Sequence, residues 1–108
     1  MIQRREIRKW CQQVAREFRP QKIILFGSYA HGTATQDSDV DVLVVMPLGR
    51  GQREVLQAAA IRDRVRAPFP MDVIVRSPEK IARRLAQGDG FIAEVLHHGR
   101  LMYESKHP

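Results

Sequence analysis

Two aspartates separated by one residue, Asp39 and Asp41, open an apolar run that continues to Val45. A strand places alternate side chains on one face, so we expect the two carboxylates to share a face about 7 Å apart. Like charges this close repel, and a divalent cation such as Mg²⁺, which prefers carboxylate and phosphate oxygens, relieves that repulsion. Taken alone, two aspartates at this spacing are more often an ordinary entry to a strand.

Two further features favour a binding site over a simple turn. Gly27 and Ser28 follow a short apolar run and precede a helical turn. Glycine lets a ligand approach the backbone closely, and amides at a helix start attract phosphate. Asp72 begins a third apolar run, so it is another carboxylate at the mouth of a strand. If these strands pair, Asp72 joins the first two carboxylates.

The elements that must position these residues follow from hydrophobic periodicity and from turn residues. A serine followed by proline at positions 77 and 78 predicts a helix start. The resulting class is α/β, with three or four strands covered by helices. We expect helices over 2–18, 52–66 and 91–98 and a helix starting at 78; strands over 23–26, 40–46 and 71–76; and an extended piece at 101–103.

Several side chains have expected places within these elements. Val55, Leu56, Ala59 and Ile61 are predicted to supply the apolar surface of the helix over 52–66. Ile81 and Leu85 are predicted to form the buried stripe of the next helix. Gly99 is predicted to close the last helix in a left-handed conformation.

The size and composition of the chain indicate one domain, residues 1–108. Hydrophobic content of 44% and charged content of 28% are ordinary for a soluble globular protein. No apolar run approaches the roughly 18 residues of a membrane span, and the first residues lack the apolar region of a secretory signal. A single cysteine, Cys11, suits a reducing cytoplasm and is expected in the core.

The formal net charge is +6, from 18 Lys and Arg against 12 Asp and Glu. Such a balance suits an anionic partner, which could be a nucleotide, a nucleic acid or an acidic protein surface. The arginines are spread along the sequence from Arg4 to Arg100 rather than gathered in a block. General solubility is therefore at least as good an explanation, and a nucleic acid is not expected as a direct partner.

The segment from Gly27 to Asp41 resembles a known signature. It has Gly-Ser, ten residues and then Asp-x-Asp, with Gly32 in the loop and Ser38 before the first aspartate. Together with Asp72, this is similar to the DNA polymerase beta-type nucleotidyltransferase superfamily. Within it, the chain most resembles the minimal nucleotidyltransferases of bacteria and archaea, often encoded beside HEPN-domain proteins. The resemblance implies an α+β fold with a small mixed sheet.

The resemblance also implies roles for individual residues. Gly27 and Ser28 match the pair that holds the triphosphate of the nucleotide. Asp39 and Asp41 match the carboxylates that bind Mg²⁺. Asp72 matches the third carboxylate, which completes a second metal site and receives the proton of the attacking hydroxyl. Two Mg²⁺ ions and ATP, or another nucleoside triphosphate, are the implied cofactor and substrate.

The implied activity is Mg²⁺-dependent transfer of a nucleoside monophosphate, in the first place AMP from ATP, to an acceptor hydroxyl. The family context favours an antitoxin that adenylylates a HEPN ribonuclease toxin. Few residues follow the third strand, so the acceptor site must be open or completed by a partner or a second copy. Two alternatives stay open: an aminoglycoside-like enzyme acting as a homodimer on a small molecule, and a non-catalytic antitoxin that masks its toxin.

One residue departs from the family pattern. His31 stands where relatives often have arginine, which leaves a neutral or partly charged group near the phosphates at neutral pH. No metal ligand is lost by this change, so we expect activity to be retained, in weakened form.

Overall fold

A computed structural model describes residues 1–106 of the chain. Within these residues no helix has both the length and the apolar character needed to cross a membrane. The elements, in order, are α1 (Arg4–Phe18), β1 (Lys22–Phe26), α2 (Ser28–His31), β2 (Val40–Val45), α3 (Glu54–Arg64), β3 (Met71–Arg76), α4 (Pro78–Ala86), α5 (Gly90–His98) and β4 (Arg100–Glu104).

The four strands form one mixed sheet in the order β3-β2-β1-β4. β2 and β3 run parallel, with α3 as the helix that connects them, whereas β1 is antiparallel to both β2 and β4. This confirms the expected mixed α/β architecture. The extended piece predicted at 101–103 is the edge strand β4.

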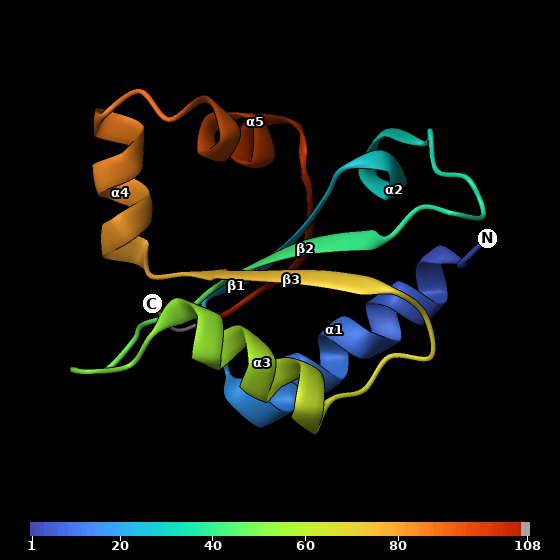
Figure 1. The fold of residues 1–108 in the computed structure, drawn as a ribbon, viewed down its shortest axis with the longest axis horizontal. Coiled ribbons are helices and arrows are strands. Elements are labelled where there is room, and N and C mark those ends of the chain that lie inside the picture. The colour runs from blue at the N-terminus through green and yellow to red at the C-terminus, as the bar shows by residue number, and fades with distance from the viewer. Residues whose placement is uncertain (107–108) are drawn as a thin grey trace.

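Helices cover both faces of the sheet, as Figure 1 shows: α1 and α3 lie on one side, and α4 and α5 on the other. Apart from Lys22 and Asp41, the central strands β1 and β2 are apolar at every position, because alternate side chains enter different cores. Leu25, Val42 and Val44 pack with α1 and α3, and Leu43 and Val45 pack beneath α5.

Two predictions of buried side chains are wrong. Val55 and Leu56 are 72% and 60% exposed, whereas Ile61 is buried as predicted, together with Ala58. Alanine-rich composition predicts a helix without fixing which of its faces meets the sheet, so the predicted apolar set included two residues of the exposed face. Leu85 is also exposed, because α4 packs beside α5 rather than over the centre of the sheet.

Gly99 ends α5, but not in the predicted left-handed conformation. Its φ is −73° and its ψ is 166°, an extended geometry open to any residue. A Cβ at this position would lie 2.6 Å from Cγ2 of Ile24 and 3.0 Å from the carbonyl oxygen of Leu25. Glycine is therefore needed here because the end of α5 passes directly against β1.

Cys11 lies fully buried on the inner side of α1, as expected. Burial raises the pKa of its thiol to about 12, because the thiolate is poorly solvated there. We expect no reaction between the native protein and a thiol-specific chromogenic reagent at pH 8, and one equivalent of reaction after unfolding in guanidinium chloride. Rapid labelling of the folded protein would contradict this packing.

Candidate functional site

The three predicted carboxylates converge at the end of the sheet where β2 and β3 begin. In the parallel register of these strands, Asp41 pairs directly with Asp72. Asp39 precedes β2 by one residue and follows the same alternation. Since Leu43 and Ile74 continue the same face beneath α5, the carboxylates lie on the side of the sheet that carries α4 and α5.

Hydrogen bonds fix the conformation of the chain segment that leads to these carboxylates. The N–H of Val40 donates to the carbonyl of Pro70 at 3.0 Å, which extends the β2–β3 pairing to the start of both strands. The preceding loop is closed by Thr35 and Ser38: the N–H of Thr35 donates to Oγ of Ser38 at 2.9 Å, and the N–H of Ser38 donates to the Thr35 carbonyl at 3.1 Å. Asp39 therefore directly follows a hydrogen-bonded turn rather than an unconstrained loop.

The electrostatics of the site are repulsive. Burial, followed by the negative charges of Asp72 and Asp39, raises the pKa of the Asp41 carboxyl above its ordinary value of 3.8. Among residues 1–106, no lysine, arginine or histidine makes an ion pair with any of the three carboxylates. Arg76, at the other end of β3, pairs with Glu54 at 3.6 Å. The site thus concentrates negative charge without protein cations to balance it.

This donor set fits Mg²⁺ that is completed by a nucleotide. Within the described part of the chain, no three His, Cys, Asp or Glu side chains form a closed cluster ready to hold a metal ion. Mg²⁺, however, is usually bound by one or two carboxylates together with water and substrate phosphates, rather than by an all-protein cage. The neighbouring oxygens of Asp41 and Asp72, with Asp39 beside them, supply the protein share of such a site.

Gly27 places the backbone after β1 directly against these carboxylates. Its φ of 75° and ψ of −155° belong to a region that only glycine adopts readily. A Cβ there would overlap Oδ2 of Asp41 and lie 3.3 Å from its Cγ. The predicted phosphate-holding pair, Gly27 and Ser28, is therefore brought to the carboxylates, with Ser28 as the first residue of α2.

Two arginines that sequence reasoning missed hold α2 in place. Nη2 of Arg4 donates to the carbonyl of Tyr29 at 3.2 Å, and Nε of Arg100 donates to the carbonyl of Ala30 at 3.1 Å. Cations at the carboxyl end of a helix are favourable because its last carbonyls are otherwise unsatisfied. His31, the last residue of α2, is exposed beside them.

An aromatic pair, also missed from the sequence, borders the site. Phe26 pairs with Asp41 across the β1–β2 ladder, so their side chains stand on the same face. The ring of Phe91, near the start of α5, meets Phe26 edge to face with centroids 5.5 Å apart. Phe91 remains 46% exposed, which gives the site an apolar wall open to solvent. No local pattern marks either residue, because their proximity depends on the packing of α5 over β1.

Comparison with known proteins is consistent with this geometry. The nucleotidyltransferase domain family matches residues 5–101. A Methanocaldococcus jannaschii protein assigned as a protein adenylyltransferase is 33% identical over 85 residues, covering 79% of this chain and 80% of its own. The fold is similar to that of a nucleotidyltransferase assigned in Sulfolobus solfataricus, with a TM-score of 0.65 and 21% identity over 95% of this chain and 81% of the other.

A second solved structure, of a toxin–antitoxin with AMP-PNP, shares the fold with a TM-score of 0.52 and 17% identity, over 92% of this chain and 74% of the other. The family match spans nearly the whole chain, and the Methanocaldococcus relative independently covers most of it. The chain belongs to the nucleotidyltransferase domain family and is a nucleotidyltransferase.

Proposed function

We propose that this enzyme transfers AMP from ATP, in the presence of Mg²⁺, to a hydroxyl group on a partner toxin, and that the toxin is a HEPN ribonuclease. The observation that carries the proposal is the grouping of Asp39 and Asp72 around Asp41, which itself lies directly against Gly27. Within residues 1–106 none of these carboxylates forms an ion pair. The name of the Methanocaldococcus relative and the toxin–antitoxin complex with AMP-PNP support transfer to a protein. The resemblance to minimal nucleotidyltransferases supports the HEPN class.

In this proposal the chain contributes position and charge. Asp39, Asp41 and Asp72 would hold Mg²⁺, with two ions in the full site, and bound Mg²⁺ neutralises the phosphates and the charge that develops on the oxygens. Gly27 and Ser28 would hold the triphosphate, with the Ser28 hydroxyl as one donor. Asp72 would accept the proton of the attacking hydroxyl. That oxygen then bonds to the α-phosphorus as the bond to the β-phosphate oxygen breaks and pyrophosphate leaves.

The surface beside the carboxylates supports a protein as the acceptor. Apolar side chains are exposed along α4, α5 and β4, on the same side of the sheet as the site. Apolar and aromatic residues of this kind anchor protein interfaces. A partner docked there would present its hydroxyl next to the wall formed by Phe26 and Phe91. The four exposed residues are Leu85, Phe91, Leu96 and Leu101.

The test is transfer from ATP to a purified HEPN-domain ribonuclease toxin, with the product of the neighbouring gene as the first acceptor to be tried. With Mg²⁺, label in the α-phosphate should enter the toxin and label in the γ-phosphate should not, because pyrophosphate leaves. Removing the metal with EDTA should stop transfer. Toxin mass should rise by one AMP, and its ribonuclease activity should fall in parallel.

Further experiments test separately the identity of the acceptor and the need for catalysis in toxin inhibition. Transfer of label to small-molecule acceptors, with none to the toxin, would reject the acceptor while retaining the enzyme. Inhibition of the toxin by a variant carrying both Asp39→Asn and Asp72→Asn would show that binding alone masks it. The variant Asp37→Asn, with an exposed aspartate in the same loop, should behave as wild type.

A further inference from the structure

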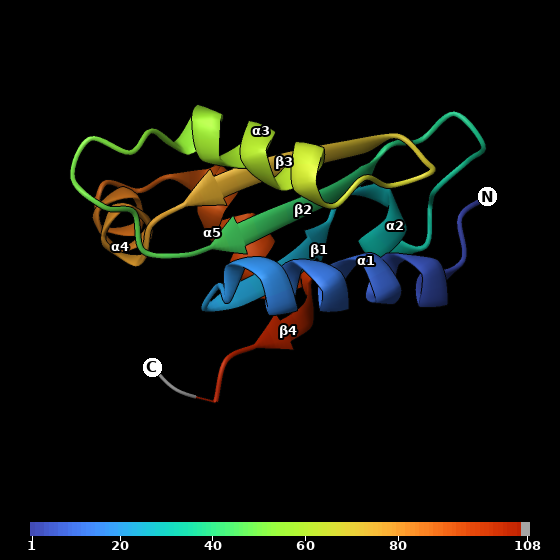
Figure 2. The same ribbon diagram turned by 90° about the horizontal axis from the view of Figure 1, so that it is seen from below.

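The net charge of the protein is concentrated on one side of the sheet. Residues 1–21 and 53–66, which comprise α1, α3 and their flanking turns, hold ten Lys and Arg against four Asp and Glu. The rest of the chain holds eight of each. All of the formal charge of +6 therefore belongs to these two segments, which lie together over the sheet in Figure 2. We call their outer surface the basic face.

The cations of the basic face are mostly free to meet an external partner. Among residues 1–106, the one ion pair formed between two members of this face joins Arg64 to Glu17 at 3.2 Å. The unpaired cations lie along the outside and at the end of α1 and at both ends of α3. The exposed ones without an ion pair are Arg5, Arg8, Lys9, Arg16, Arg19, Arg53, Arg62 and Arg66.

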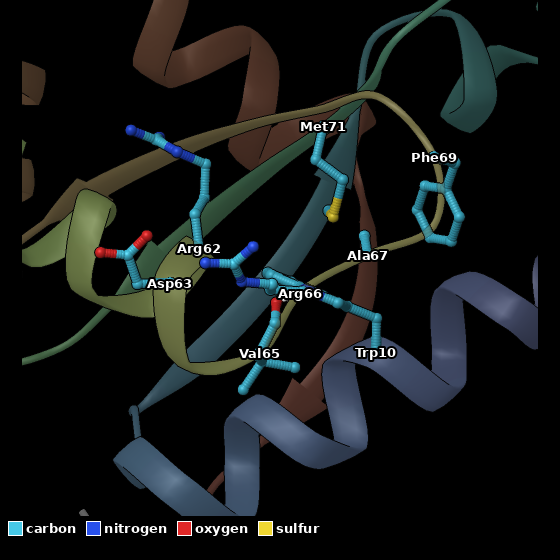
Figure 3. A pocket seen from close by; sticks show the side chains of 8 residues that line it. All are labelled: Trp10, Arg62, Asp63, Val65, Arg66, Ala67, Phe69 and Met71. Carbon is cyan, nitrogen blue, oxygen red and sulfur yellow. Dashed lines mark hydrogen bonds between the residues drawn. The ribbon is translucent and has the colours of Figure 1, made fainter.

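A hollow of about 300 Å³ lies between α1 and α3, as Figure 3 shows. Arg62 and Arg66 border it from the α3 side, and Lys9 and Arg66 border the adjoining hollow beside α1. The aromatic residues at its base, Trp10 and Phe69, are only 3% and 9% exposed. The hollow thus offers arginine and lysine at its rim but no free aromatic ring on which a base could stack.

We propose that the basic face binds the phosphate backbone of a double-stranded nucleic acid without reading its sequence. Nine of its ten cations are arginines, whose planar forks match phosphate oxygens. A single strand is disfavoured because the two aromatic residues at the hollow of the basic face, Trp10 and Phe69, are buried. An acidic protein is less favoured because α1 exposes no large apolar side chain within the described residues, although α3 exposes Val55 and Leu56 in its first turn.

This surface is independent of the catalytic site. The carboxylates face α4 and α5, and the basic face is on the other side of the sheet, so nucleic acid and a protein acceptor could be bound together. The arginines that are spread along the sequence are gathered in space, since the folded α1 and α3 share one layer. The proposal therefore stands whether or not the acceptor is a toxin.

Two charge-reversal variants test the location of binding at equal net charge. The first carries Lys9→Glu, Arg62→Glu and Arg66→Glu; the second carries Arg50→Glu, Arg83→Glu and Lys106→Glu at exposed positions outside the face. Both have a formal net charge of zero. Fluorescence anisotropy with RNA and DNA duplexes of the same sequence, over 50–200 mM salt, gives the affinities.

We expect wild type to bind both duplexes within a fewfold of each other and to weaken steeply with salt. The basic-face variant should lose about 30-fold in affinity and reduce the salt slope by about 3, as expected for three lost phosphate contacts. The variant with reversals outside the basic face should lose much less affinity for the duplex. A milder version, Lys9→Gln with Arg62→Gln and Arg66→Gln, keeps the test valid if the reversed variant does not fold by circular dichroism.

Three results would overturn the proposal. Equal loss in both reversal variants would mean that total charge, not this face, governs binding. Tighter binding of a single strand than of a duplex would contradict backbone recognition. Displacement of the duplex by polyglutamate at equal charge concentration would identify the face as a docking surface for an acidic protein.

Discussion

Replacing Asp41 with asparagine is expected to stop nucleotidyl transfer and, at the same time, to raise the melting temperature. The carboxylate is half-buried beside two others, so its charge is unfavourable in the folded protein until a cation binds. Loss of a metal ligand removes several kcal/mol of transition-state stabilisation, about 10³-fold in rate. Thermal melting at pH 7 without Mg²⁺ should rise by a few degrees, because asparagine keeps the shape and removes the repulsion.

The pH dependence of this gain has a defined sign. The pKa of Asp41 in the folded protein lies above its ordinary value of 3.8, so the folded state binds the proton more tightly than the unfolded state. Asp41 therefore destabilises the fold above its folded pKa and has no such effect below 3.8. The difference in melting temperature between the variant and wild type should shrink as the pH falls toward that value.

Asp63→Asn is a matched control for this prediction, because Asp63 is an exposed aspartate on α3, outside the site. It should change stability by no more than about 0.5 kcal/mol and leave transfer unchanged. Addition of Mg²⁺ with a non-hydrolysable ATP analogue should stabilise wild type and Asp63→Asn but not Asp41→Asn. An Asp41→Asn protein that melts below wild type would mean that the carboxylate supports the fold, contrary to its repulsive surroundings.

Local signals in the sequence were sufficient to predict the elements but not all of their faces. The strand over 71–76 is predicted with its observed bounds, and Ser77 caps α4 as predicted, accepting from the N–H of Lys80 at 3.1 Å. These features depend on β-branched runs and on cap chemistry, which act over a few residues. Val55 and Leu56 were misplaced because the sheet, not the helix sequence, decides which side of α3 is buried.

The candidate site likewise contains residues that local sequence signals predict and residues that they do not. Its charged and glycine residues could be read from the sequence because their spacing is local to one strand-loop-strand segment, and Asp72 because it opens its own strand. The residues that hold these groups in place could not be predicted from the sequence. Arg4 and Arg100 act on α2 across 25 and 70 residues of sequence, and Phe91 reaches Phe26 only through the packing of α5. Long-range contacts of this kind depend on topology, which no local motif encodes.

The second large effect is expected from Gly27→Ala. The substitution places a methyl group in steric overlap with Oδ2 of Asp41 and forces alanine into a conformation that only glycine adopts readily. Both the backbone near the triphosphate and the Asp41 carboxylate must move. Displacements of about 1 Å at reacting groups can reduce rates about 10²-fold, and strained φ/ψ values cost roughly 1–3 kcal/mol. Initial rates of transfer and thermal melting measure the two effects.

Gly32→Ala separates close approach from backbone strain. Gly32 has a φ of 76°, almost the same as the 75° of Gly27, but no atom lies within 4 Å of the position of its Cβ. Its ψ of 19° places it in the left-handed region that other residues adopt at a cost of about 1–2 kcal/mol. We therefore expect Gly32→Ala to lower stability modestly while transfer continues at nearly the wild-type rate. If both alanine variants lose activity to the same extent, the contact between Gly27 and Asp41 does not organise the site. The backbone conformation of both glycines that flank α2 would then be what activity requires.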